Sequence, residues 1–119
     1  MNVIKMLPFL ETEDLDELVE QIVKKEITNE HITIYAIIPF LENRQVDKLF
    51  ECSLKGEIDV CPAGFLPFVE DEKIKDIAQR IDKGEITTLS METLMPFMDN
   101  GTIREFFKSE LSNLKSKTE

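Results

Sequence analysis

A proline–phenylalanine pair flanked by Leu, Ile, Val or Met occurs four times in this chain, and it limits the folds that the chain can adopt. The four copies are Leu7-Pro8-Phe9-Leu10, Ile38-Pro39-Phe40-Leu41, Leu66-Pro67-Phe68-Val69 and Met95-Pro96-Phe97-Met98. The prolines at 8, 39, 67 and 96 are therefore 31, 28 and 29 residues apart. A period in this range is typical of repeat proteins, in which each unit packs against its neighbours along the chain.

The residues after each proline have the pattern of an amphipathic helix. Apolar residues lie seven, ten and eleven positions after the proline, which places them on one helix face. They are Leu15, Leu18 and Val19; Val46, Leu49 and Phe50; Ile74, Ile77 and Ala78; and Ile103, Phe106 and Phe107. Four positions after the prolines lie the N-cap residues that we predict, Thr12, Asn43, Asp71 and Asn100. We expect these helices, called B, at 13–25, 44–55, 72–83 and 101–112.

A second shared motif follows the first three B helices. It reads Lys-Lys-Glu-Ile-Thr at 24–28, Lys-Gly-Glu-Ile-Asp at 55–59 and Lys-Gly-Glu-Ile-Thr at 83–87. Glycine in a left-handed conformation commonly ends a helix, and the apolar residue that follows can pack back on it. The motif therefore predicts the end of each B helix.

The apolar segments that carry the Pro-Phe pairs are predicted to form a shorter helix, called A, before each B helix. We expect these at 3–10, 29–41, 60–69 and 88–98. Proline in the last turns removes a backbone hydrogen bond, so each A helix should bend or tighten there. The third A helix contains Pro62 and Gly64, which predicts irregular or 3₁₀ structure and leaves a hinge open as an alternative. Because the pairs recur at one phase, we expect Phe9, Phe40, Phe68 and Phe97 to be buried between adjacent units.

Together these patterns predict one all-α domain over residues 1–119, a right-handed stack of about four helix-pair repeats. The units cover approximately 1–27, 28–58, 59–86 and 87–112, and a polar tail covers 113–119. At the level of architecture the chain resembles the α-solenoid class, in the manner of HEAT and armadillo repeats. The resemblance implies a curved stack whose B helices line the side that faces a partner.

The charge balance argues against two classes of partner. The chain has 14 Lys and Arg against 24 Asp and Glu, a net charge of −10. Such a chain repels phosphate backbones and anionic lipid surfaces, so we predict neither a nucleic-acid nor a membrane partner. No signal-peptide pattern is present, and the longest apolar-rich run, residues 32–41, is too short to span a bilayer. We therefore expect a cytoplasmic protein.

The sequence carries little that predicts catalysis. It has no glycine-rich phosphate loop, and His31 is its only histidine, expected near the start of the second A helix. Cys52 and Cys61 do not have the spacing of metal ligands. Cys61 falls in a predicted first helix turn, where the helix dipole could activate a thiol, although an inert cysteine is the commoner case. We predict no enzyme activity, no metal and no cofactor.

The remaining hypotheses concern the acidic residues. Six acids of the first two B helices are candidates to bind a basic protein partner: Glu13, Asp16, Glu17, Glu20, Asp47 and Glu51. In one alternative, a ladder of Glu26, Glu57 and Glu85 serves a cation-dependent hydrolase, although pairing with nearby lysines or capping of the following helix is the commoner explanation of such residues. In another, the chain is an acidic mimic of nucleic acid that inhibits a basic protein. Either terminal unit could also form a homodimer through its uncovered face.

Overall fold

The computed structural model describes residues 3–28 and 30–118, and over these residues every regular element is a helix. Side chains are described for 3–28 and 30–115. The all-α class is therefore confirmed for this part of the chain.

Four longer helices stand where the B helices are predicted. They are α2 (Thr12–Val23), α4 (Asn43–Leu54), α5 (Asp71–Asp82) and α7 (Asn100–Thr118). Each begins one residue before its predicted start. The first three end within two residues of the predicted end, whereas α7 continues to Thr118. Residues 113–118 are therefore helical, and the predicted break between helix and tail is wrong.

The predicted N-cap residues are off by one position. Thr12, Asn43, Asp71 and Asn100 are already the first helical residues, and the capping position is occupied by the acid before each of them. Glu11 and Glu42 form capping boxes with Asp14 and Gln45, in which each side chain accepts the other's backbone N–H. Before α7, Asp99 Oδ1 accepts the backbone N–H of Thr102 at 2.7 Å. A carboxylate here also complements the positive end of the helix dipole, which explains the acid at each start.

The predicted helix ends are confirmed. Lys25, Gly56 and Gly84 have φ angles of 65°, 74° and 80°, and the next residue's N–H bonds back to the carbonyl five residues earlier. This is the Schellman arrangement, which satisfies carbonyls that the helix end leaves free. The isoleucines that follow are buried or half-buried against the core, as expected: Ile27, Ile58 and Ile86.

The A segments are shorter than predicted, and each tightens into a 3₁₀ turn at its proline. They are α1 (Val3–Met6) with η1 (Leu7–Phe9), α3 (Ile34–Ile37) with η2 (Ile38–Phe40), η3 (Pro62–Phe68), and α6 (Met91–Leu94) with η4 (Met95–Phe97). The predicted starts at 29, 60 and 88 are too early. In the second unit the chain first makes a separate turn, in which the Thr28 N–H donates to His31 Nδ1 at 3.1 Å. His31 therefore precedes α3 instead of lying in its first turn.

The third A segment is 3₁₀ throughout, as the sequence predicts. Its Phe65 and Leu66 are buried, and Tyr35 packs against it. The Tyr35 hydroxyl donates to the Cys61 carbonyl at 2.7 Å, and its ring meets Phe65 edge-on at 6.1 Å. These contacts favour a shortened helix over a hinge.

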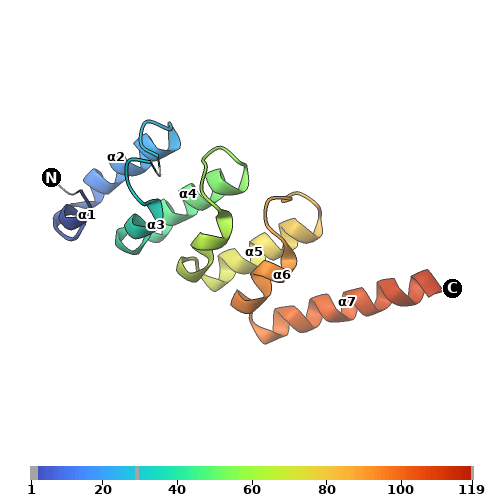
Figure 1. Cartoon of the computed structure of the whole chain (residues 1–119). Coiled ribbons are helices and arrows are strands. Elements are labelled where there is room, and N and C mark those ends of the chain that lie inside the picture. The colour runs from blue at the N-terminus through green and yellow to red at the C-terminus, as the bar shows by residue number, and fades with distance from the viewer. Residues whose placement is uncertain (1–2, 29, 119) are drawn as a thin grey trace.

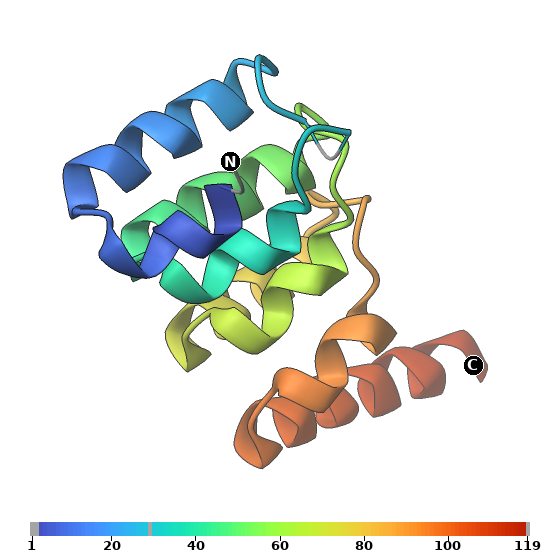
Figure 2. The ribbon, with the colours of Figure 1, turned by 60° about the vertical axis from the view of Figure 1, so that its left-hand side comes forward.

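The helix pairs lie side by side in chain order. In Figure 1, α2, α4 and α5 follow one another from the N-terminus, and α7 continues beyond them to the C-terminus. Figure 2 shows the short A segments in a second layer beside the B helices. The described chain is elongated, with extents of 65 × 24 × 18 Å.

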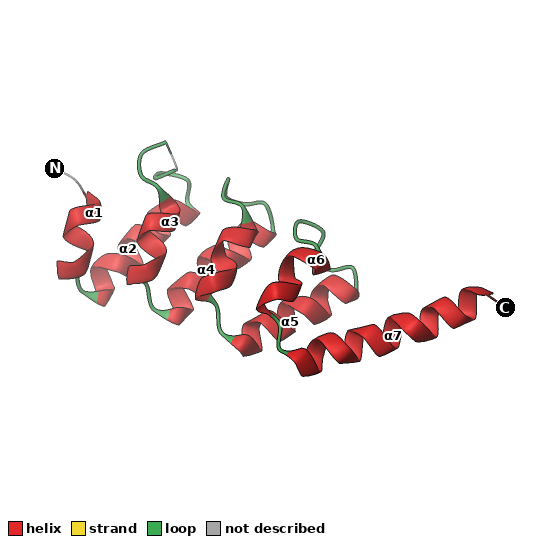
Figure 3. Ribbon diagram, turned by 60° about the horizontal axis from the view of Figure 1, so that its bottom comes forward, coloured by secondary structure: helices red, strands yellow, loops and turns green. Residues whose placement is uncertain are grey.

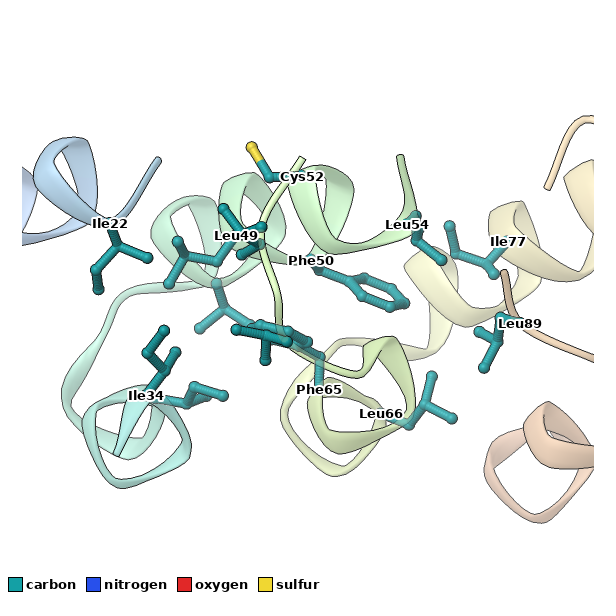
Figure 4. Close-up of a cluster of buried hydrophobic side chains, with 14 of the residues drawn as sticks. Ile22, Ile34, Leu49, Phe50, Cys52, Leu54, Phe65, Leu66, Ile77 and Leu89 are labelled. Carbon is teal, nitrogen blue, oxygen red and sulfur yellow. The ribbon is translucent and has the colours of Figure 1, made fainter. Parts of the chain in front are cut away.

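The core runs along the seam between the two layers. Its largest members are Phe50 of α4 and Phe65 of η3, whose ring centroids are 5.7 Å apart (Figure 4). The positions seven, ten and eleven residues after each proline are buried or half-buried in the first three units, so this part of the helical pattern is confirmed. The second and third A segments add both residues that precede their proline, Ile37 and Ile38 and Phe65 and Leu66, whereas the first and fourth add one each, Leu7 and Leu94.

The predicted burial of the four Pro-Phe phenylalanines is wrong. Phe9, Phe40, Phe68 and Phe97 are 85%, 38%, 39% and 37% exposed, and all four prolines are exposed too. The reason is the narrow apolar stripe of a short 3₁₀ turn. That stripe is filled by the residues before the proline, so the phenylalanine after it points away from the core.

Candidate functional site

The exposed Pro-Phe pairs form a continuous feature of the surface. The turns that join each A segment to its B helix all lie on one side of the row, opposite the loops that lead to the next unit (Figure 3). We call this side the Pro-Phe edge; it consists of Pro8, Phe9, Pro39, Phe40, Pro67, Phe68, Pro96 and Phe97, together with the capping acids Glu11, Glu42, Glu70 and Asp99. An exposed aromatic ring and an exposed carboxylate thus alternate from unit to unit.

Hydrogen bonds between units hold two of the capping acids in position. Thr12 Oγ1 donates to Glu42 Oε1 at 3.0 Å, and Asn43 Nδ2 donates to Glu70 Oε1. In the last unit the Thr102 backbone N–H lowers the pKa of Asp99. These carboxylates are therefore held in place by hydrogen bonds, yet remain open to solvent.

Three of the six predicted partner-binding acids bind basic residues of the neighbouring unit. Asp16 of α2 accepts two hydrogen bonds from the Arg44 guanidinium, at 2.8 and 3.0 Å, and a third from the buried Gln45 at 2.7 Å. These hydrogen bonds hold the pKa of Asp16 below its usual value, and those from Arg44 have the largest effect. Glu20 pairs in the same way with Lys48, which lowers the pKa of Glu20.

Glu51 has the strongest of these interactions. Arg80 of α5 donates to both of its oxygens, at 2.6 and 3.1 Å, and Lys73 donates to Oε1 at 2.8 Å. Arg80 above all, and then Lys73, lower the pKa of Glu51 to about 2. Asp16, Glu20 and Glu51 therefore link neighbouring B helices.

The other three predicted acids lie on the surface. Glu13 and Glu17 are exposed on α2, and Asp47 is half-buried on α4. The structure thus does not gather the six acids into one open patch. At the first junction the bridging role had a signal in the sequence, because acids lie eight and twelve residues after Pro8 and bases lie five and nine residues after Pro39. The pairing of Glu51 had no such signal, since its partners lie six and thirteen residues after Pro67.

The predicted glutamate ladder is open to solvent. Glu26, Glu57 and Glu85 are all exposed, in the turns that end α2, α4 and α5. Glu57 also lies close to the Cys52 thiol. The pKa of that thiol is raised chiefly by burial and secondly by the Glu57 carboxylate.

Cys61 lines an open cleft of about 660 Å³ between the connecting loops of the first two units. Ile22, Glu57, Asp59 and the buried Ser53 also border it. Cys61 is exposed, and it caps η3 instead of lying in the first turn of a longer helix. The helix-dipole argument for its reactivity is correspondingly weak.

Comparisons with known proteins give no relative. No protein-family model matches the chain, and no match was found among the curated proteins or the solved structures. Over the part of the chain that the structure describes, no helix is both long and apolar enough to cross a bilayer. Nor, within that part, do three or more His, Cys, Asp or Glu residues form a group that could hold a metal ion.

Proposed function

We propose that this chain is a short α-solenoid that acts as a non-enzymatic protein-binding module, and that the Pro-Phe edge is its binding surface. The observation that carries the proposal is the exposure of a phenylalanine at the same position in every unit. A right-handed, HEAT-like stack is part of this proposal. It is supported by the recurrence of the helix pairs at 28–31 residues and by the elongated shape of the described chain.

The spacing of the edge suits an extended peptide. Packed helices lie about 8–10 Å apart, so neighbouring phenylalanines should repeat at about that interval. A peptide in the polyproline II conformation advances about 3.1 Å per residue with three residues per turn, so every third side chain lies on one face and would meet one ring. Aromatic side chains that are half-covered by their own protein are also typical anchors in interfaces.

The charge of the edge suits a basic partner. Each phenylalanine lies two residues before an exposed capping carboxylate, and the chain as a whole has a net charge of −10. The partner that fits is a protein segment with an apolar residue about every third position and Lys or Arg between them.

Selection from a random peptide library tests this proposal without knowledge of the natural partner. We expect the wild-type chain to enrich peptides with apolar residues at intervals of three and with basic residues between them. The double variant Phe40→Ser/Phe68→Ser should lose this enrichment, and binding of the selected peptides should weaken as salt rises.

The matched control is Leu111→Ser, which changes a residue that is 40% exposed on α7, away from the edge. Circular dichroism verifies that each variant is folded. Enrichment that is the same for the wild type and the edge variant, or enrichment of acidic peptides, would contradict the proposal.

A further inference from the structure

The two ends of the row expose positions that are buried in the other units. We number positions from the proline of each unit, so that Phe50, eleven residues after Pro39, is at +11. Position +11 is at most 2% exposed in the first three units, but Phe107 in the last is 62% exposed. Position −2 is fully buried in the last three units, but Met6 in the first is 40% exposed. A following unit therefore covers +11, and a preceding unit covers −2.

Contacts between neighbouring units define which positions meet. Phe50 at +11 meets Phe65 at −2 of the next unit, with ring centroids 5.7 Å apart. Asn43 at +4 donates to Glu70 at +3 of the next unit. At the first junction position +8 pairs with +5, as Asp16 with Arg44, and position +12 pairs with +9, as Glu20 with Lys48. At the second junction Glu51 at +12 instead binds Lys73 at +6 and Arg80 at +13.

The same positions at the two ends are complementary to each other. The tail face of the last unit carries Asn100 at +4, Arg104 at +8, Phe107 at +11 and Lys108 at +12. The head face of the first unit carries Met6 at −2, Glu11 at +3, Glu13 at +5 and Glu17 at +9. Glu11 accepts the backbone N–H of Asp14, and Glu17 accepts a bond from Gln21, both within the first unit. Over the described residues, the charged groups of these two faces form no ion pair with another unit.

We propose that the tail face of one chain docks on the head face of a second copy, in the register that joins the first unit to the second. Arg104 then meets Glu13, and Lys108 meets Glu17. These pairs have the geometry of Asp16 with Arg44 and Glu20 with Lys48, but with the signs reversed. Asn100 donates to Glu11 as Asn43 does to Glu70.

The apolar part of the junction also follows the internal pattern. Phe107 packs on Met6 as Phe50 packs on Phe65, and a thioether against an aromatic ring is a favourable contact. The charged pairs would attract the two faces to each other, and together with the buried Phe107–Met6 contact they would fix the alignment of one copy on the next. Because different faces of the two copies meet, the assembly is heterologous and grows into open chains unless it closes into a ring.

A charge-swap experiment tests this docking in solution. We measure sedimentation velocity of the full chain over a concentration series, at low and at high salt. The wild type should associate reversibly, and the association should weaken with salt. Arg104→Glu/Lys108→Glu makes both end faces acidic, and Glu13→Lys/Glu17→Lys makes both basic. Each variant alone should lose at least about tenfold in association constant, whereas an equimolar mixture should recover association.

The control Lys55→Glu/Lys83→Glu changes the net charge as much as the tail variant does, at exposed lysines in the inter-unit turns. It should associate like the wild type. A wild-type chain that stays monomeric at every concentration overturns the proposal. So does continued association of the tail variant alone, which indicates head-to-head contact, or of the head variant alone, which indicates tail-to-tail contact.

Discussion

The junctions between the first three units differ from the junction before α7. At the first two junctions, acids of one B helix bind bases of the next: Asp16 binds Arg44, Glu20 binds Lys48, and Glu51 binds Arg80 and Lys73. At the third, the equivalent positions hold Gln79 and Glu105, which cannot form an ion pair and which border a small cleft between α5 and α7. The hydrogen bond of Asn43 to Glu70 also has no counterpart there, since Asp71 and Asp99 are both acids.

This difference shows what each kind of contact contributes. Apolar burial is continuous through the first three units. The ion pairs between neighbouring B helices add to this burial by fixing how one helix is oriented against the next. Where the bridges are missing, α7 is held mainly by Ile103, Phe106 and the buried Thr102 at its start. The rest of α7 runs beyond the other helices (Figure 1) and leaves Phe107, Leu111 and Leu114 exposed.

The largest expected effect comes from removing a ring at position +11. Phe50→Ala should lower the free energy of unfolding by about 3–5 kcal/mol, because Phe50 is fully buried against Phe65. Phe107→Ala removes the same atoms from an exposed site and should cost less than about 1 kcal/mol. Urea unfolding followed by circular dichroism, at low protein concentration, measures both. Similar losses in the two variants would show that Phe107 is covered in solution as Phe50 is.

A smaller effect is expected at the Glu51 bridge, and it depends on pH. The pKa of Glu51 in the folded chain is about 2, below its ordinary value of 4.5, so ionised Glu51 stabilises the fold above pH 4.5. That contribution is lost as the pH falls from 4.5 through about 2. Glu51→Gln should therefore cost about 1–3 kcal/mol at pH 7, and its difference from the wild type should shrink below pH 4.5.

Unfolding in urea at a series of pH values tests the Glu51 prediction. Glu20→Gln is the matched control, because the pair of Glu20 with Lys48 is almost half exposed and should contribute less. A difference between wild type and Glu51→Gln that stays constant from pH 7 to pH 3 would argue against the bridge.

The smallest effect is expected when a bridge is added to the third junction. Gln79→Glu/Glu105→Lys places an acid at +12 and a base at +9, as in Glu20 and Lys48. We expect a gain of about 0.5 kcal/mol in the free energy of unfolding, since the pair is exposed. Gln79→Glu alone puts two acids together and should destabilise the chain. A double-mutant cycle by thermal unfolding gives the interaction energy, and a coupling of zero would mean that α5 and α7 do not meet in the register of the earlier helices.

The sequence predicted the positions of the helices better than it predicted which side chains are buried and which residues cap the helices. The 3.6-residue period of apolar positions places all four B helices, and the Lys-Gly-Glu-Ile motif marks where two of them end. Repetition indicates that Phe9, Phe40, Phe68 and Phe97 occupy equivalent positions, but it does not indicate whether those positions are buried or exposed. Their exposure follows from the 3₁₀ turn, whose apolar face is already filled by residues such as Leu7 and Ile38. The capping acids were missed because three of them are Glu, which is not a preferred N-cap type, whereas the residue after each is Thr, Asn or Asp.

The ring of Tyr35 lies so close to Gly64 that the residue at one position limits which residue is possible at the other. A Cβ atom on Gly64 would lie 2.1 Å from Cε1 of Tyr35, so no other residue fits at 64 while the tyrosine keeps its place. Homologous sequences that gain a side chain at 64 should therefore carry a smaller residue at 35. Such covariation would record, across evolution, a contact that joins segments 29 positions apart.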